Sequence, residues 1–94
     1  MEIRRCDSFG KKLKGLMFKK SFDYGVRIRC NGIHTFFMFK AIDVVLTDKN
    51  NIILYIYKNV KPNRIIWPKK GVFYTYELPS NTVIKNKVGE KFII

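Results

Sequence analysis

The chain has 94 residues, 47% of them hydrophobic and 15% aromatic, and its 19 basic residues outnumber 7 acidic ones to give a net charge of +12. This length supports one core, and each apolar run is too short to cross a bilayer, so residues 1–94 are predicted to form a single domain without a membrane span. Because the first residues also lack the apolar segment of a secretory signal, the expected location is cytoplasmic.

The N-terminal third of the chain is predicted to contain a short strand, one short helix and a second strand. Residues 2–6 have the composition of a strand. Over residues 7–17, apolar side chains recur at spacings of three and four, which is typical of a helix with one buried side. Over residues 26–30 the period changes to two, and Arg27 and Arg29 alternate with apolar neighbours, so one face of this strand is expected to be wet.

The middle of the chain is predicted to hold three strands. Residues 34–39 follow an Asn-Gly turn signal and are apolar at nearly every position, so they are expected to form a central strand. Residues 42–47 and 52–57 are rich in β-branched and aromatic side chains. The polar residues between these two runs indicate a hairpin.

The C-terminal third is predicted to contain a loop, a strand, a helical turn and a last strand. Residues 60–71 hold two prolines, which cannot donate to a ladder, and are expected to form the loop. Residues 72–78 have strand character, residues 80–86 favour a single helical turn or a loop opened by Ser80, and residues 91–94 form a short strand. Six or seven such strands predict an all-β, mainly antiparallel fold. We expect a compact β-sandwich or barrel with one short helix near the N-terminus and a helical turn near the C-terminus.

Several short stretches occur in the order found in a known family. They are "GLMF" at 15–18, "IHTFFM" at 33–38, "IDVVLTDKNN" at 42–51, "VKPNRI" at 60–65, "YELPSNTV" at 76–83 and "KVGEKF" at 87–92. Together they make the chain resemble the "domain of unknown function 192" family of small uncharacterised prokaryotic proteins. The resemblance implies a compact β-sandwich or barrel with short helices, and it implies no activity.

His34 and Asp43 are the polar residues near the two ends of the apolar run at 33–45. A histidine oriented by a carboxylate acts as a general base or a metal ligand. However, the chain has one histidine, no serine in a nucleophile elbow and no phosphate-binding glycine pattern, so neither a metal nor a cofactor is predicted. Alternatively, His34 ends a strand while Asp43 accepts hydrogen bonds from the backbone or Lys40. An enzyme with a His34/Asp43 acid-base pair is the least favoured hypothesis.

The aromatic side chains suggest the first functional hypothesis, a non-enzymatic binding or accessory module. An apolar cleft lined by Phe36, Met38 and Trp67, with His34 or Asp43 at its rim, would take a small ligand or a peptide. Trp67 lies in the predicted loop among cations. It therefore either contacts a base or a partner protein, or closes one end of the core as a lid.

The basic residues suggest the second hypothesis, an anion-binding module for nucleic acid, an acidic protein or a membrane surface. No sequence-specific nucleic-acid motif accompanies them, so a solvated face is the alternative interpretation. Basic side chains on exposed strands also oppose pairing with a second copy, and a monomer is expected. The candidate residues are Lys11, Lys12, Lys14, Arg27, Arg29, Lys61, Arg64, Lys69 and Lys70.

Overall fold

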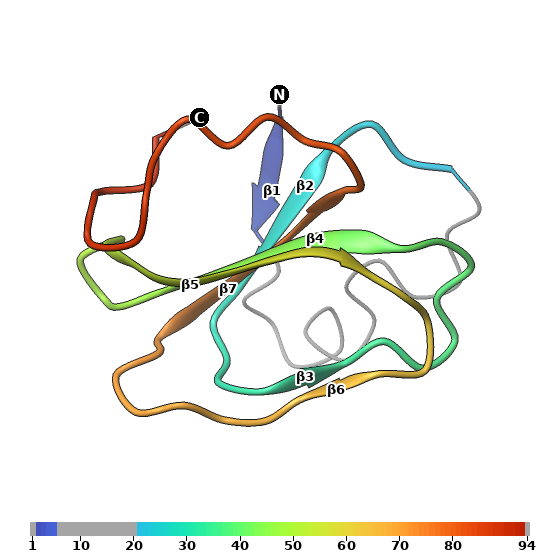
Figure 1. Ribbon diagram of the computed structural model, residues 1–94, viewed down its shortest axis with the longest axis horizontal. Helices are drawn as coiled ribbons and strands as arrows, with labels where there is room; N and C mark the ends of the chain where they lie inside the picture. The colour runs from blue at the N-terminus through green and yellow to red at the C-terminus, as the bar shows by residue number, and fades with distance from the viewer. Residues whose placement is uncertain (1, 6–20, 94) are drawn as a thin grey trace.

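A computed structural model describes residues 2–5 and 21–93, whose strands form a five-stranded sheet and a separate two-stranded ribbon (Figure 1). The order in the sheet is β1-β2-β7-β4-β5, and the ribbon pairs β3 with β6. The β1–β2 pair is parallel and the other pairs are antiparallel, which confirms the predicted all-β, mainly antiparallel class. The strands are β1 (Ile3–Arg5), β2 (Gly25–Ile28), β3 (Ile33–His34), β4 (Ile42–Thr47), β5 (Ile53–Val60), β6 (Ile65–Ile66) and β7 (Tyr74–Pro79).

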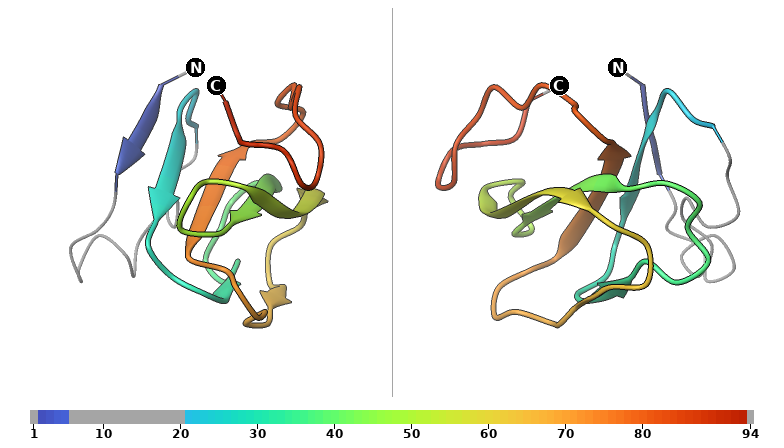
Figure 2. Two further views of the ribbon diagram at one scale, coloured as in Figure 1. Left: turned by 90° about the vertical axis from the view of Figure 1, so that its left-hand side faces the viewer. Right: turned by 45° about the vertical axis from the view of Figure 1, so that its right-hand side comes forward.

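Strand β4 is buried along its whole length because the protein covers both faces of the sheet. On one face, Val44 packs in a cluster that includes Ile66 of the ribbon. On the other face, Val45 packs in a cluster that includes Phe92 of the C-terminal segment, residues 82–93. Figures 1 and 2 show the ribbon and this segment on opposite sides of the sheet. The β-branched run of β4 is therefore a two-sided core strand.

The hairpin between β4 and β5 is confirmed, and an aspartate shapes its turn. The Asp48 carboxylate oxygen Oδ1 accepts hydrogen bonds from the backbone N–H groups of Asn50 at 2.8 Å and Ile52 at 2.9 Å. Asn51 has a φ of 67°, a left-handed conformation that asparagine tolerates better than most residues. These contacts fix the direction of the Asn51 side chain, which projects toward the sheet.

The predicted central strand at 34–39 is wrong, because the chain turns after His34. The N–H of Met38 donates to the Thr35 carbonyl at 3.3 Å, and Phe37 has a φ of 66°. The buried Thr35 hydroxyl in turn accepts from the Arg64 N–H at 2.8 Å. These long-range bonds replace the continuation of the strand.

The structure also corrects the predictions for the C-terminal third. The predicted loop at 60–71 contains β6. Residues 80–86, predicted as a helical turn or a loop, form a loop, which begins with a turn in which Thr82 N–H donates to the Pro79 carbonyl at 3.3 Å. In place of a last strand, a single bridge joins Lys91 to Ile52. The helix predicted near the N-terminus lies outside the described residues. Within the described part of the chain, no helix has the length and apolarity of a membrane span.

Candidate functional site

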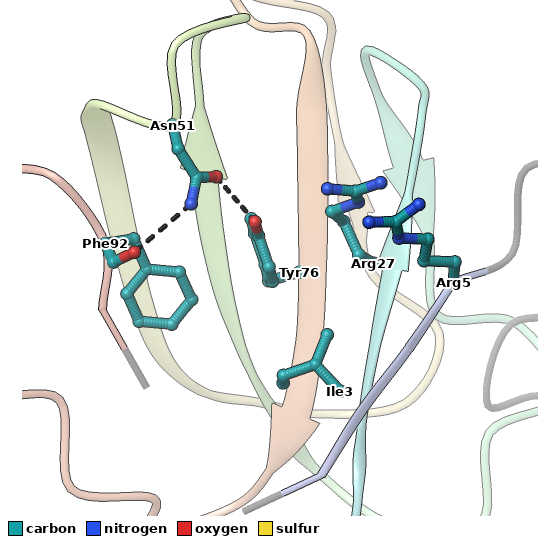
Figure 3. A pocket seen from close by; sticks show the side chains of 6 residues that line it. All are labelled: Ile3, Arg5, Arg27, Asn51, Tyr76 and Phe92. Atoms are coloured by element: carbon teal, nitrogen blue, oxygen red, sulfur yellow. Dashed lines mark hydrogen bonds between the residues drawn. The ribbon is translucent and has the colours of Figure 1, made fainter.

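Three side chains form a row across the sheet on the face covered by the C-terminal segment. Arg5 of β1 is the register partner of Arg27 of β2, and Arg27 is the partner of Tyr76 of β7. Register partners project to the same face of a sheet, and neighbouring strands lie about 4.8 Å apart. Figure 3 shows the two guanidinium groups side by side and pointing in the same direction. The sheet therefore holds two positive charges together.

The two arginines line a cavity of about 270 Å³. Ile3, Asn51, Tyr76 and Phe92 complete its described lining, so that lining contains two cations and no carboxylate. This volume gives room for a phosphate or carboxylate group with a small body attached. Guanidinium groups match both kinds of oxyanion with paired N–H donors.

A hydrogen-bond network builds the wall opposite the arginines. The Tyr76 hydroxyl donates to Asn51 Oδ1 at 2.5 Å, and Asn51 Nδ2 donates to the Phe92 carbonyl at 3.2 Å (Figure 3). The Phe92 N–H returns a bond to the Asn51 carbonyl at 2.9 Å, and the Phe92 ring meets the Tyr76 ring edge-on with centroids 4.7 Å apart. These contacts connect β7, the β4–β5 turn and the C-terminal segment, and the Tyr76 hydroxyl already donates its proton within the network.

Neighbouring residues position Arg27 and separate Arg5 from Arg4. The Arg27 guanidinium lies 4.4 Å from the centroid of the Tyr74 ring, an arrangement that favours one orientation of the side chain. Arg4 projects to the face opposite Arg5 because consecutive strand residues alternate. Its Nε donates to the Glu2 carboxylate at 3.0 Å, and this hydrogen bond raises the pKa of the Arg4 guanidinium. The Glu2 carboxylate is therefore paired with Arg4.

The predicted pair of His34 and Asp43 takes separate partners. Asp43 is completely buried and accepts hydrogen bonds from Lys58 Nζ at 2.5 Å, Asn59 N–H at 2.8 Å and Thr82 N–H at 3.0 Å. His34 is exposed, and its Nδ1 accepts from the Phe36 N–H at 3.2 Å. The hydrogen bonds of the described residues do not join the two side chains. Asp43 uses backbone donors as expected, with Lys58 in place of Lys40.

The residues predicted to line one cleft are distributed between the core and the surface. Met38 is buried in the cluster beneath the ribbon, whereas Phe36 is 37% exposed. Trp67 is 67% exposed, so the interpretation of this side chain as a lid on the core is wrong. A second described cavity, of about 300 Å³, lies elsewhere and is lined by Phe22, Lys40, Ala41, Pro79 and Ser80.

The predicted cationic residues also occupy different places. Arg27 lines the arginine cavity, and Arg29 lies with its guanidinium 4.8 Å from the Phe73 ring centroid. Lys69 is half-buried, with Nζ 5.6 Å from the Tyr55 ring centroid. Lys61, Arg64 and Lys70 are exposed. Lys11, Lys12 and Lys14 lie outside the described residues.

Comparison of the whole sequence with protein families identifies one match that spans the fold and the cavity. Residues 1–92 match the family DUF192, described as "Uncharacterized ACR". The chain belongs to the DUF192 family. The resemblance seen in the sequence motifs is thereby confirmed, and with it the membership of a family of uncharacterised prokaryotic proteins.

Relatives and solved structures of the DUF192 fold extend this result. The UPF0127 protein of Pyrococcus horikoshii is 39% identical over 96% of this chain and 84% of its own length. The UPF0127 protein of Thermococcus sibiricus is 31% identical over 95% of this chain and 63% of its own length. A crystal structure of a protein of unknown function from Novosphingobium aromaticivorans superposes with a TM-score of 0.74 at 14% identity, over 84% of this chain and 63% of that one. A crystal structure from Sinorhizobium meliloti 1021, described as a proposed transcription regulator, has a TM-score of 0.73 at 17% identity. The match covers 83% of this chain and 67% of that one. These structures support the fold.

Sequence reasoning missed most of the cavity. Arg27 was a candidate through its charge. Asn51 and Tyr76 lie in stretches that carry the family resemblance, but that resemblance implied no role for them, and Arg5 lies in none of these stretches. The available signal was the alternation of charged and apolar residues in the strand at 26–30, which indicates that Arg27 faces away from the apolar side. The pairing partners of that strand were needed to identify the rest.

Proposed function

We propose that this DUF192 protein is a non-enzymatic binding module that takes a small ligand with a phosphate or carboxylate group in the Arg5–Arg27 cavity. The observation that carries the proposal is the alignment of two guanidinium groups on neighbouring strands, on a face whose described lining has no carboxylate. The register places the two side chains on the same face of neighbouring strands, where one oxyanion can accept charge-assisted hydrogen bonds from both guanidinium groups.

The remaining lining residues favour binding over chemistry. Ile3 and the Phe92 ring offer apolar contact, while Asn51 and the Tyr76 hydroxyl are engaged with each other. The described lining holds no serine or cysteine nucleophile and no carboxylate or histidine base, the side chains that covalent or acid-base mechanisms generally use. Apolar side chains beside two cations form the arrangement of a site that recognises an anionic group attached to a small carbon skeleton.

The proposal is tested by calorimetric titration of the protein with inorganic phosphate and with succinate, at low and at moderate ionic strength. We expect saturable binding of at least one probe, weakened by salt because the attraction is electrostatic. Charge-assisted hydrogen bonds contribute about 1.5–3 kcal/mol each, so Arg5→Gln and Arg27→Gln should each weaken binding about 10- to 150-fold.

Arg4→Gln is the matched control because Arg4 belongs to the same strand as Arg5 but projects to the opposite face. This variant should bind the probes within about twofold of the wild-type affinity, since the Arg4 side chain lies on the opposite face of the sheet and is paired with Glu2. Absence of binding for both probes, or an equal loss in Arg4→Gln and Arg5→Gln, contradicts the proposal. Far-ultraviolet circular dichroism of each variant verifies that the fold is retained.

A further inference from the structure

The outer face of the β3–β6 ribbon presents a group of apolar and aromatic side chains, which we call the ribbon face: His34, Phe36, Ile65 and Trp67. His34 and Ile65 are register partners and project to the same side. The His34 and Phe36 rings stack with centroids 4.9 Å apart. Ile66 is buried between two exposed neighbours, Ile65 at 45% and Trp67 at 67%, so Trp67 extends the same outer side. The ribbon thus turns one apolar side to the core and another to the solvent.

Side-chain hydrogen bonds clamp both ends of this short ribbon. At one end, the buried Thr35 hydroxyl accepts from the Arg64 N–H at 2.8 Å and donates to the Lys61 carbonyl at 2.8 Å. At the other end, the Asn31 amide donates to the Lys69 carbonyl at 2.7 Å and accepts from the Lys69 N–H at 2.8 Å. A face held in place before binding loses less conformational entropy when a partner docks. The ribbon face is preorganised.

The charged residues that flank β6 in the sequence are all basic. Residues 49–76, which include β6 and its flanking turns, contain six lysines and arginines and no aspartate or glutamate. Lys58 is engaged by Asp43, whereas Lys61, Arg64 and Lys70 are exposed beside the ribbon in sequence. An apolar centre with a positively charged rim is complementary to a partner with apolar anchors and negative charge.

We propose that the ribbon face docks an acidic polypeptide segment that carries aromatic or aliphatic anchor residues. Ile65 lies opposite His34 in the ribbon, and an aliphatic side chain offers a nucleic-acid base no ring to stack on. His34 and Phe36 already use one ring surface each for their mutual stacking. Tryptophan and arginine are the residue types that most often dominate protein–protein affinity, and Trp67 and Arg64 occupy the face and its rim. The observations therefore favour a protein partner over single-stranded nucleic acid.

The first experiment selects ligands from a phage-displayed library of random 12-residue peptides against the immobilised full chain. We expect enriched peptides with net negative charge and at least one aromatic or leucine residue. Synthetic copies should shift the fluorescence of Trp67, the single tryptophan of the chain, as it becomes buried. Failure to enrich peptides above an uncoated surface, or enrichment of basic peptides, overturns the proposal.

Two substitutions on the ribbon face and one elsewhere locate the binding surface. Ile65→Ser and Trp67→Ala remove exposed side chains and should weaken the selected peptides at least tenfold, as measured by fluorescence polarisation of labelled peptide. Val83→Ser is the matched control because Val83 is 81% exposed and belongs to the C-terminal segment on the other side of the sheet (Figure 2). Equal affinity in all variants overturns the proposal. The proposal is also overturned if a labelled 20-nucleotide oligo(dT) binds more tightly than the selected peptides and the same two substitutions abolish that binding. This result would assign the ribbon face to nucleic acid.

Discussion

Asp43 provides the sharpest test of how this fold is held together. It is completely buried in β4, and its two carboxylate oxygens receive three hydrogen bonds, from Lys58, Asn59 and Thr82. The bonds join β4 to β5 and to the turn after β7. In Asp43→Asn, the side chain keeps nearly the same volume, but one oxygen becomes an NH₂ group. That group faces the Lys58 and Thr82 donors, so donors oppose donors inside the protein.

The expected cost follows from the bonds that are lost. A charge-assisted bond contributes about 1.5–3 kcal/mol, and a buried N–H left without an acceptor costs about 1–3 kcal/mol. The lower part of these ranges applies to Lys58, since its side chain is 48% exposed and water can solvate the ammonium group. We expect Asp43→Asn to lower the free energy of unfolding by about 3 kcal/mol, a large fraction of the 5–15 kcal/mol typical of a small domain.

Urea unfolding followed by circular dichroism measures this difference, with Asp48→Asn as the matched control. Asp48 receives both of its backbone bonds on the single oxygen Oδ1, and an asparagine side chain retains such an oxygen. Its substitution should therefore change stability by less than about 0.5 kcal/mol. If Asp43→Asn is as stable as Asp48→Asn, the buried carboxylate does not hold the two segments to β4 and the reasoning fails.

Two further predictions concern single positions of the fold. Gly32 and Gly89 have φ values of 95° and 92°, and a Cβ at Gly32 meets Pro68 Cγ at 2.8 Å whereas one at Gly89 meets nothing within 4 Å. Gly89→Ala should lower the free energy of unfolding by about 1 kcal/mol because of the backbone conformation alone. Gly32→Ala should lower it further because the new Cβ clashes with Pro68, and equal melting temperatures for the two variants would exclude a contribution from this clash. Thr35→Val removes a buried hydroxyl that accepts a hydrogen bond from the Arg64 N–H. The free energy of unfolding measured in urea should fall by about 2 kcal/mol. A cost below about 0.5 kcal/mol would show that this hydroxyl does not stabilise the ribbon.

The sequence was most informative where neighbouring residues decide the structure. The β-branched run at 42–47 and the alternation around Arg27 predicted strands that the structure contains, because both signals depend on the period of side chains along one strand. The prediction failed at 34–39, where the chain turns because Thr35 bonds to residues 61–64. A partner so far along the chain leaves no local pattern.

The candidate site was harder to predict than the fold. Arg5, Arg27 and Tyr76 meet only because three strands pair in a particular order and register, and single-sequence patterns do not specify register between distant strands. Asp43, predicted at the rim of a cleft, is instead completely buried, because donors from β5 and from the turn after β7 satisfy its charge. Charge alone identified Arg27, and it could not separate this residue from the other cations.

The position of β7 has a consequence for synthesis on the ribosome. β7 is the last strand in the sequence, yet it lies in the middle of the sheet between β2 and β4. A nascent chain that ends before residue 74 therefore leaves one edge of β2 and one edge of β4 without a hydrogen-bonding neighbour, and such edges recruit other chains. Residues 74–79 therefore have to be synthesised before the sheet acquires its central strand.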